Sequence, residues 1–207
     1  MNPSIARNPS AESKKALRKT LLEARLHAAL EPASQQALSR RLLDALKHHE
    51  PACVGFYWPL SGEFDARGAI AIWLALGAHR QAGLPVITKR GEPLQFHAWA
   101  PDTPMKIGHH RIPEPASEQV VVPDLLLVPC VGFDAEGYRL GYGGGYYDRT
   151  LAAWPAAKKP LTVGVAFEAC RTGALEREAH DIPLDLIITD AASYPPHAQP
   201  QRQAGSA

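Results

Sequence analysis

The sequence predicts an α/β fold with a largely parallel sheet, and two features support this prediction. Short apolar runs typical of buried strands alternate with longer segments whose leucines recur at helical spacing. One run, "PDLLLVPCVGFD", is continuously aliphatic at its centre, as expected of a central strand buried on both faces. Alternation of this kind builds parallel sheets, and ligands of such sheets sit beyond the carboxyl ends of the strands.

Helical segments are recognised by leucines that recur every three or four residues. The first begins at Ser13, a residue type that caps helices, and basic residues fill its other faces. In the third, Ile70, Leu74 and Leu76 are expected to face the core. The helices are predicted over residues 13–30, 33–48, 65–82 and 146–153.

Strands are expected where short apolar runs are bounded by proline, glycine or polar residues. In "LQFHAWAP", Leu94, Phe96 and Ala98 alternate with their neighbours, which is the period of a strand. A chain of 207 residues without a convincing internal linker is long enough to bury one core and predicts a single domain. The expected strands lie in "ACVGFYWPL", "LPVITKR", "LQFHAWAP", "PDLLLVPCVGFD", "LTVGVAF" and "LDLIITD".

The two ends of the chain differ from the middle. Residues 1–12 are polar with two prolines, and residues 193–207 are rich in proline, glutamine and small residues. Such segments have little apolar surface to bury, so both are expected to be disordered tails around a domain over residues 13–192.

Composition limits the classes of function. With 22 basic and 21 acidic residues the net charge is +1, which gives no electrostatic argument for binding nucleic acid or an anionic membrane. The three cysteines show no zinc-binding spacing and indicate a reducing compartment. No apolar run resembles a signal peptide or a membrane-spanning helix. We therefore expect a cytoplasmic protein.

The stretch "RLGYGGGYYDRTL", from Arg139 to Leu151, is the strongest local signal. Each glycine in an ordered element costs about 0.5–1 kcal/mol relative to alanine, so a compensating role is expected. Glycines allow backbone N–H groups to converge on a phosphate at the start of the following helix. The spacing matches neither a Walker A loop nor the dinucleotide fingerprint, and a turn shaped only by chain geometry is the alternative.

The neighbours of the glycines favour phosphate. Arg139 and Arg149 flank the loop and could pair with phosphate oxygens. Asp148 is a candidate ligand for magnesium, which prefers carboxylate, phosphate and water oxygens. Tyr146 and Tyr147 could stack on a flat heterocycle, or one could pack in the core while the other faces solvent.

Together with three other stretches, this region resembles the 5-formyltetrahydrofolate cyclo-ligase family. The stretches are "KKALRKTLLEAR", "VGFYWPLSGEFD" and "EAHDIPLDLIITD". The resemblance implies a single-domain, three-layer Rossmann-like α/β sandwich. It also implies conversion of 5-formyltetrahydrofolate to 5,10-methenyltetrahydrofolate with ATP and Mg²⁺, and release of ADP and phosphate. A reduced folate would be the substrate, and we expect a monomer.

The resemblance also implies roles for individual residues. Lys14, Arg139 and Arg149 would be the catalytic cations, and Lys14 and Arg18 lie one helical turn apart on one side of a helix. A solvated helix face is the alternative for that basic pair. The ATP site would comprise Lys14, Lys15, Ala16, Leu17, Arg18, Arg139, Leu140, Gly141, Tyr142, Gly143, Gly144, Gly145, Tyr146 and Tyr147.

The folate and metal sites follow from the same resemblance. Glu63 would accept hydrogen bonds from the ring amide and the exocyclic amine of the pterin, a bidentate arrangement that suits a carboxylate. Trp58 has core packing as its alternative, and Asp181 could instead cap a turn before Pro183. The folate site would comprise Trp58, Glu63, Tyr142, Gly143, Gly144, Gly145 and Tyr146, and the magnesium ligands would be Asp148 and Asp181.

Two positions depart from the family pattern. Arg111 in "HHRIPEP" stands where the family often has a small residue, and another residue often replaces Tyr142. His97, His109 and His110 have no ligand spacing with carboxylates, and we expect them to be structural or exposed.

Two other functions remain open from the residues alone. A sugar-phosphate isomerase or coenzyme A transferase would also use a phosphate loop, but would leave Lys14, Arg18 and the two aspartates without a role. A non-catalytic binding module would predict a degraded phosphate or metal site.

Overall fold

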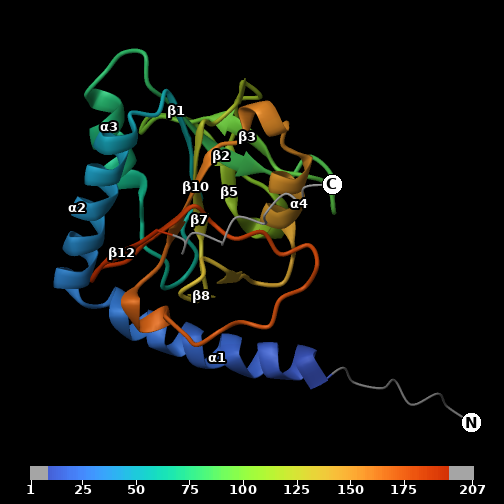
Figure 1. Ribbon diagram of the computed structural model, residues 1–207. Coiled ribbons are helices and arrows are strands. Elements are labelled where there is room, and N and C mark those ends of the chain that lie inside the picture. Colours follow the sequence, from blue (N-terminus) through green and yellow to red (C-terminus); the bar gives the residue numbers. More distant parts are fainter. Residues whose placement is uncertain (1–8, 196–207) are drawn as a thin grey trace, which may run out of the picture.

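A computed structural model describes residues 9–195 (Figure 1). The helices are α1 (Pro9–Ala29), α2 (Pro32–His49), α3 (Arg67–Ala75) and α4 (Tyr146–Ala153), with 3-10 turns η1 (His109–Arg111), η2 (Ala156–Lys158) and η3 (Glu168–Cys170). The strands are β1 (Cys53–Gly55), β2 (Gln81–Val86), β3 (Gln95–Ala98), β4 (Met105–Ile107), β5 (Pro113–Pro115), β6 (Val120–Val121), β7 (Leu125–Pro129), β8 (Gly132–Phe133), β9 (Arg139–Leu140), β10 (Leu161–Val165), β11 (Leu186–Ile188) and β12 (Ser193–Tyr194).

The central sheet is mostly parallel, as predicted. Its strand order is β12-β11-β10-β7-β1-β2-β3-β6. The run from β11 to β2 is parallel, whereas β12 at one edge and β3 and β6 at the other pair antiparallel. Two small antiparallel pairs, β4 with β5 and β8 with β9, lie outside this sheet.

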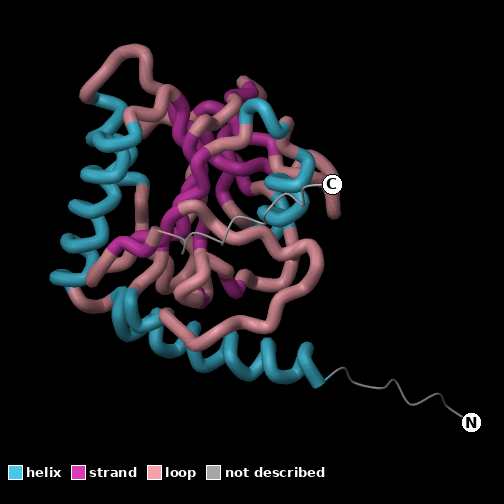
Figure 2. The backbone as a smooth tube through the Cα atoms, viewed as in Figure 1, coloured by secondary structure: helices cyan, strands magenta, loops and turns pink. Residues whose placement is uncertain are grey.

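The helices cover both faces of the sheet, which gives three layers. α2 and α3 pack together on one face, and α4 lies on the other, with the strands between them (Figures 1 and 2). α1 crosses below the sheet and contacts α2 and η3. The single-domain, three-layer α/β sandwich is thus confirmed.

The core lies where the sequence places its most apolar strand. Leu125, Leu126, Leu127 and Val128 of β7 are at most 1% exposed, which confirms a strand buried on both faces. Large side chains such as Trp73 of α3 and Phe56 after β1 fill the adjoining layer.

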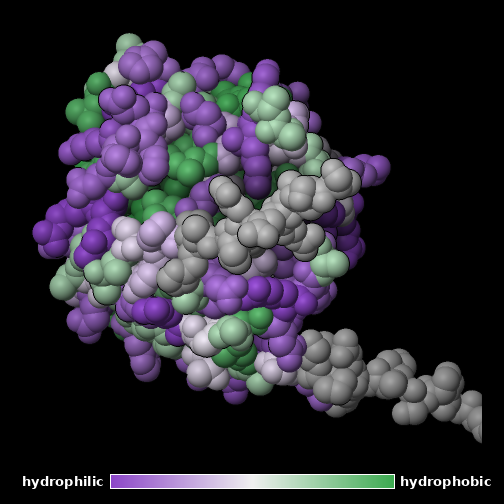
Figure 3. All heavy atoms as spheres, viewed as in Figure 1, coloured by the Kyte–Doolittle hydropathy of each residue, from purple (hydrophilic) through white to green (hydrophobic). Residues whose placement is uncertain are grey.

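Hydrophilic residues predominate on the face shown in Figure 3, and hydrophobic residues appear there in separate groups. Within residues 9–195, no helix combines the length and apolar character needed to cross a membrane.

The predicted third helix was too long. α3 ends at Ala75, and Leu76, which was expected to face the core, is 57% exposed. Gly77 follows directly, and Arg80 donates from Nη1 to the Trp73 carbonyl at 2.8 Å, which closes the end of the helix. Gln81 and Ala82 belong to β2, because they pair with Cys53 and Val54 of β1. Tertiary pairing therefore overrides the local apolar pattern here.

Helix and strand extend at both ends beyond the domain predicted over residues 13–192. α1 begins at Pro9 rather than Ser13, and proline is well suited to the first turn of a helix because it has no N–H to satisfy. Ser193 and Tyr194 form β12, since pairing with β11 supplies backbone partners that the sequence does not reveal. The rest of the predicted tails, residues 1–8 and 196–207, lies outside the described residues.

The strand order contains a topological switch point. From β1 the chain passes through α3 to β2 on one side, whereas β7 lies on the other side of β1. The connections that follow β1 and β7 therefore separate at their carboxyl ends and leave a crevice there. This is where the fold provides room for a ligand.

Burial in the sheet predicts a large difference between two leucines. Leu127→Ala in β7 should lower the free energy of unfolding by about 2–5 kcal/mol, because the deletion leaves a cavity in a close-packed core. Leu30→Ala, at a position that is 78% exposed, should change it by less than about 0.5 kcal/mol. Urea unfolding followed by circular dichroism measures both. Equal effects of the two variants would contradict the assignment of β7 as the centre of the core.

Candidate active site

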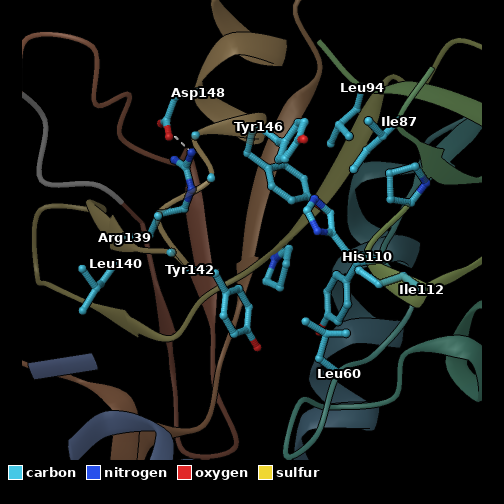
Figure 4. Close-up of a pocket in the computed structure, with 18 of the residues that line it drawn as sticks. Leu60, Ile87, Leu94, His110, Ile112, Arg139, Leu140, Tyr142, Tyr146 and Asp148 are labelled. Carbon is cyan, nitrogen blue, oxygen red and sulfur yellow. Dashed lines mark hydrogen bonds and ion pairs between the residues drawn. The ribbon is translucent and has the colours of Figure 1, made fainter. Parts of the chain in front are cut away.

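A cavity of about 600 Å³ occupies the crevice at the carboxyl ends of β1, β2 and β7. Tyr57, Trp58 and Glu63 reach it from the segment after β1, and the glycine loop after β9 closes the opposite side. Apolar side chains gather at one side in Figure 4, namely Leu60, Ile87, Leu94 and Ile112. Arg139 and Asp148 lie at the other side, with Tyr142 and Tyr146 between the two groups. The cavity therefore has a mainly apolar half, which also contains His110, and a charged half, in which Leu140 lies beside Arg139.

The glycine loop has the geometry that its sequence requires. Gly143 and Gly145 have φ values of 93° and 62°, in the left-handed region that favours glycine. A Cβ at Gly145 would lie 2.8 Å from Nη1 of Arg149. Gly145 is the N-cap of α4, and Tyr146, Tyr147 and Asp148 from the first turn line the cavity. The start of this helix is thus directed to the place where an anion would be stabilised.

Arg139 and Asp148 form an ion pair in the charged half. Nη2 of Arg139 lies 2.5 Å from Oδ1 of Asp148, and Nη1 donates to the Ile182 carbonyl at 2.9 Å. The side chains are 6% and 20% exposed. In so buried a pair each side chain keeps the other in position, because burying either charge without its partner would cost free energy.

The basic pair of α1 also faces the cavity. Lys14 donates from Nζ to Oε1 of Glu178 at 2.7 Å, and Arg18 donates from Nε to the Gly141 carbonyl at 2.8 Å. The neighbouring ammonium of Lys14 lowers the pKa of Glu178. α1 is thereby attached to both the glycine loop and the 178–181 turn, so the predicted grouping of these basic residues with the loop is present.

Both predicted metal ligands line the cavity. Asp148 is paired with Arg139, and Oδ2 of Asp181 accepts from the Glu178 N–H at 2.8 Å, which is the turn-capping role considered for it. Among residues 9–195, no group of three or more His, Cys, Asp and Glu side chains is arranged to hold a metal ion. Two carboxylates suffice where phosphate and water oxygens complete the shell of a magnesium ion, so the donor set fits that use.

Several residues that were predicted to belong to the ATP site or to be catalytic lie outside the cavity lining. Lys15 and Ala16 are exposed on α1, and Leu17 packs against the cluster of Leu21, Val131 and Leu140; none of the three lines the cavity. Arg149 lies behind the loop, where Nη2 donates to the Gly144 carbonyl at 2.7 Å. Its guanidinium lies 4.9 Å from the centroid of the Tyr146 ring.

The tyrosines and Trp58 reach the cavity in different ways. Tyr147 packs against the core, and burial raises the pKa of its hydroxyl. Trp58 is partly buried, and the Arg67 guanidinium lies over its ring, 4.2 Å from the ring centroid. Tyr142 is 46% exposed.

Sequence reasoning missed Arg25, which holds Glu63. Arg25 is 3% exposed, and its Nη1 lies 3.3 Å from Oε1 of Glu63, whose side chain is 4% exposed. Nη2 of Arg25 donates to the Ser61 carbonyl at 2.9 Å and to the Tyr142 hydroxyl at 2.7 Å. The sequence feature that could have revealed Arg25 is its position seven residues after Arg18, which places both residues on one side of α1.

The histidines are structural or exposed, as expected, but two of them also line the cavity. Nδ1 of buried His97 lies 2.9 Å from the Ser117 carbonyl oxygen. His109 and His110 are exposed on η1, and the His110 ring lies 6.2 Å from that of Tyr146 (Figure 4). Arg111 has φ 59°, in the left-handed region that is unfavourable for a residue with a Cβ.

Fold and site together define a doubly wound α/β protein with a ligand cavity at the topological switch point. The model of the 5-formyltetrahydrofolate cyclo-ligase family matches residues 10–190. The chain belongs to this family, and it is accordingly an enzyme of the ligase class.

Individual relatives agree with this assignment. The 5-formyltetrahydrofolate cyclo-ligase of Haemophilus influenzae is 33% identical over 177 residues, which cover 81% of this chain and 91% of the relative. The solved structure of Aquifex aeolicus 5,10-methenyltetrahydrofolate synthetase has a TM-score of 0.70 at 28% identity, and covers 93% of this chain and 99% of its own. The Mycoplasma pneumoniae 5,10-methenyltetrahydrofolate synthetase gives 0.66 at 25% identity, with 86% and 98% covered.

The backbone of the loop predicts different effects for two glycines. Gly145→Ala should lower the free energy of unfolding by about 1–2 kcal/mol, because a left-handed conformation is unfavourable for alanine. Gly141→Ala is the matched control, since a Cβ there meets nothing within 4 Å. Urea unfolding measures both variants. A Gly145→Ala protein as stable as Gly141→Ala would show that the left-handed conformation is not required.

Proposed function

We propose that the enzyme converts 5-formyltetrahydrofolate to 5,10-methenyltetrahydrofolate, uses ATP and Mg²⁺, and releases ADP and phosphate. The division of the cavity is the observation that supports this most. Its charged half, with the glycine loop, Lys14, Arg18 and Arg139, suits a triphosphate. Its apolar half, with Glu63 beside it, suits a flat pterin that presents N–H donors on one edge.

The proposed reaction has two steps. The formyl oxygen attacks the terminal phosphorus of ATP, the bond from that phosphorus to ADP breaks, and the oxygen becomes part of a good leaving group. The neighbouring folate nitrogen then attacks the formyl carbon and loses its N–H proton to solvent, the carbon–oxygen bond breaks, and phosphate departs with the former formyl oxygen. No step needs a nucleophile from the protein, which must instead position the two substrates and neutralise charge.

The ion pairs suggest how the charged half does this. Arg139 and Lys14 are held by Asp148 and Glu178, so they are oriented before a phosphate arrives. Phosphate oxygens would then share these cations, which we propose as the catalytic ones. We propose that Arg149 acts by holding the loop, because it bonds Gly144 and does not line the cavity.

Asp148 and Asp181 are the proposed magnesium ligands. Both line the cavity, and the Asp148 carboxylate lies beside the cation that we assign to phosphate binding. When bound, magnesium would neutralise charge on the phosphate oxygens. We further propose that the enzyme acts as a cytoplasmic monomer and binds no nucleic acid.

The activity itself gives the first prediction. The purified protein, mixed with 5-formyltetrahydrofolate, ATP and Mg²⁺, should show the rising ultraviolet absorbance of the methenyl product. Omission of any one component should abolish the rise, because phosphoryl transfer needs all three. A folded protein that produces no methenyl compound would overturn the proposal and favour another phosphate-dependent enzyme. Folate or nucleotide binding without turnover would instead indicate a binding module.

Removal of one carboxylate tests the metal assignment. Asp148→Asn should lower magnesium-dependent turnover about 100-fold or more, because the magnesium ion that would neutralise the transferring phosphoryl group loses a carboxylate ligand. Asp102→Asn, an exposed aspartate outside the cavity, is the matched control and should keep wild-type turnover. Circular dichroism and urea unfolding check that both variants fold. Turnover and magnesium dependence within twofold of wild type in Asp148→Asn would exclude Asp148 as a metal ligand.

A further inference from the structure

The carboxylate of Glu63 is already occupied by groups of the chain itself. Oε2 accepts from the Leu60 N–H at 2.7 Å. Oε1 accepts from the Tyr142 hydroxyl at 2.7 Å and from Nη1 of Arg25 at 3.3 Å. A pterin that pairs with Glu63 through two N–H donors must therefore compete with a partner that is already in place.

Tyr142 is the partner best able to move. Arg25 is 3% exposed and has three acceptors on this side of the cavity, whereas Tyr142 is 46% exposed. Tyr142 is carried by the glycine loop, between Gly141 and Gly143. In Figure 4 it projects into the cavity with its hydroxyl directed away from Tyr146. Its side chain can leave without loss of the backbone contact between Leu60 and Glu63.

The hydroxyl of Tyr142 is a donor to Glu63 rather than an anion beside it. Burial, with the charge of Glu63, raises the pKa of this hydroxyl above its usual value, so it stays protonated near neutral pH. It also accepts from Nη2 of Arg25, and the Arg25 guanidinium lies 5.5 Å from the centroid of its ring. Two groups therefore hold Tyr142 beside Glu63 when the site is empty: the Glu63 carboxylate, which accepts from its hydroxyl, and Arg25, which donates to that hydroxyl and lies near its ring.

We propose that Tyr142 is a gate for the pterin site: it occupies the Glu63 carboxylate when that site is empty and swings away when the folate binds. The inference rests on the proposed function, since it takes Glu63 as the group that holds the pterin. Exchange of one phenolic donor for the paired N–H donors of the ring favours substrates that offer both donors. A ligand with one donor merely replaces the hydroxyl that it displaces.

A single oxygen atom tests the gate. Tyr142→Phe keeps the ring but removes the hydroxyl that competes for Glu63. The apparent Kd for 5-formyltetrahydrofolate should then fall about five- to tenfold, because the apparent Kd is the intrinsic Kd divided by the fraction of molecules whose gate is open. Calorimetric titration without ATP measures this and avoids turnover. Tyr138→Phe, outside the cavity, is the matched control and should bind as wild type does. An unchanged or raised Kd in Tyr142→Phe would overturn the gate.

The Glu63→Ala background, which leaves no side-chain acceptor at this position, shows whether Tyr142 acts through Glu63. There the Tyr142→Phe substitution should change the Kd less than twofold, because the two residues are coupled. An effect as large as in the wild-type background would show that Tyr142 acts on the ligand directly and would overturn the gate. Wild-type protein that binds no 5-formyltetrahydrofolate would overturn the proposed function and the gate together, whereas wild-type binding with an unchanged Tyr142→Phe overturns the gate alone.

Discussion

Two ion pairs at the cavity are buried, and the arrangement of the site depends on this constraint. Arg139 with Asp148 and Arg25 with Glu63 have side chains that are largely removed from water. A single charge in such surroundings would be strongly unfavourable, so each group fixes the position of its partner. A ligand that enters the cavity therefore exchanges partners with an existing pair. Binding by exchange would suit the highly charged triphosphate that we propose this site to hold and release.

The fold brings together at the cavity segments that are far apart in the sequence. Arg18 on α1 bonds the Gly141 carbonyl, and Arg25 on the same helix bonds both Ser61 and Tyr142. One helix thus ties the loop after β9 to the segment after β1, across the switch point of the sheet. The two halves of the cavity are held together by α1, which also places Lys14 and Arg18 at the same cavity as the glycine loop.

Local pattern was enough to predict some elements and not others. β7 and α4 were predictable because an aliphatic run and a glycine boundary each determine the local structure strongly. The antiparallel edges were not, since β6 and β12 are two-residue strands that exist only through their partners. The same holds for the site. Glu63 and the loop glycines are marked by their motif, whereas Arg25 becomes important only when folding brings it to Glu63.

Left-handed backbone conformations occur on both sides of the cavity, but in different types of residue. On one side, Gly143 and Gly145 adopt left-handed conformations at little cost. On the other, His110 and Arg111 adopt them with φ 54° and 59°, which is unfavourable for residues with a Cβ. The pairing of β4 with β5 and the bond from the Gly108 N–H to the Ile112 carbonyl at 2.9 Å enforce that turn. The position of His110 beside Tyr146 therefore depends on the hairpin, just as the position of Tyr142 over Glu63 depends on the glycine loop and Arg25.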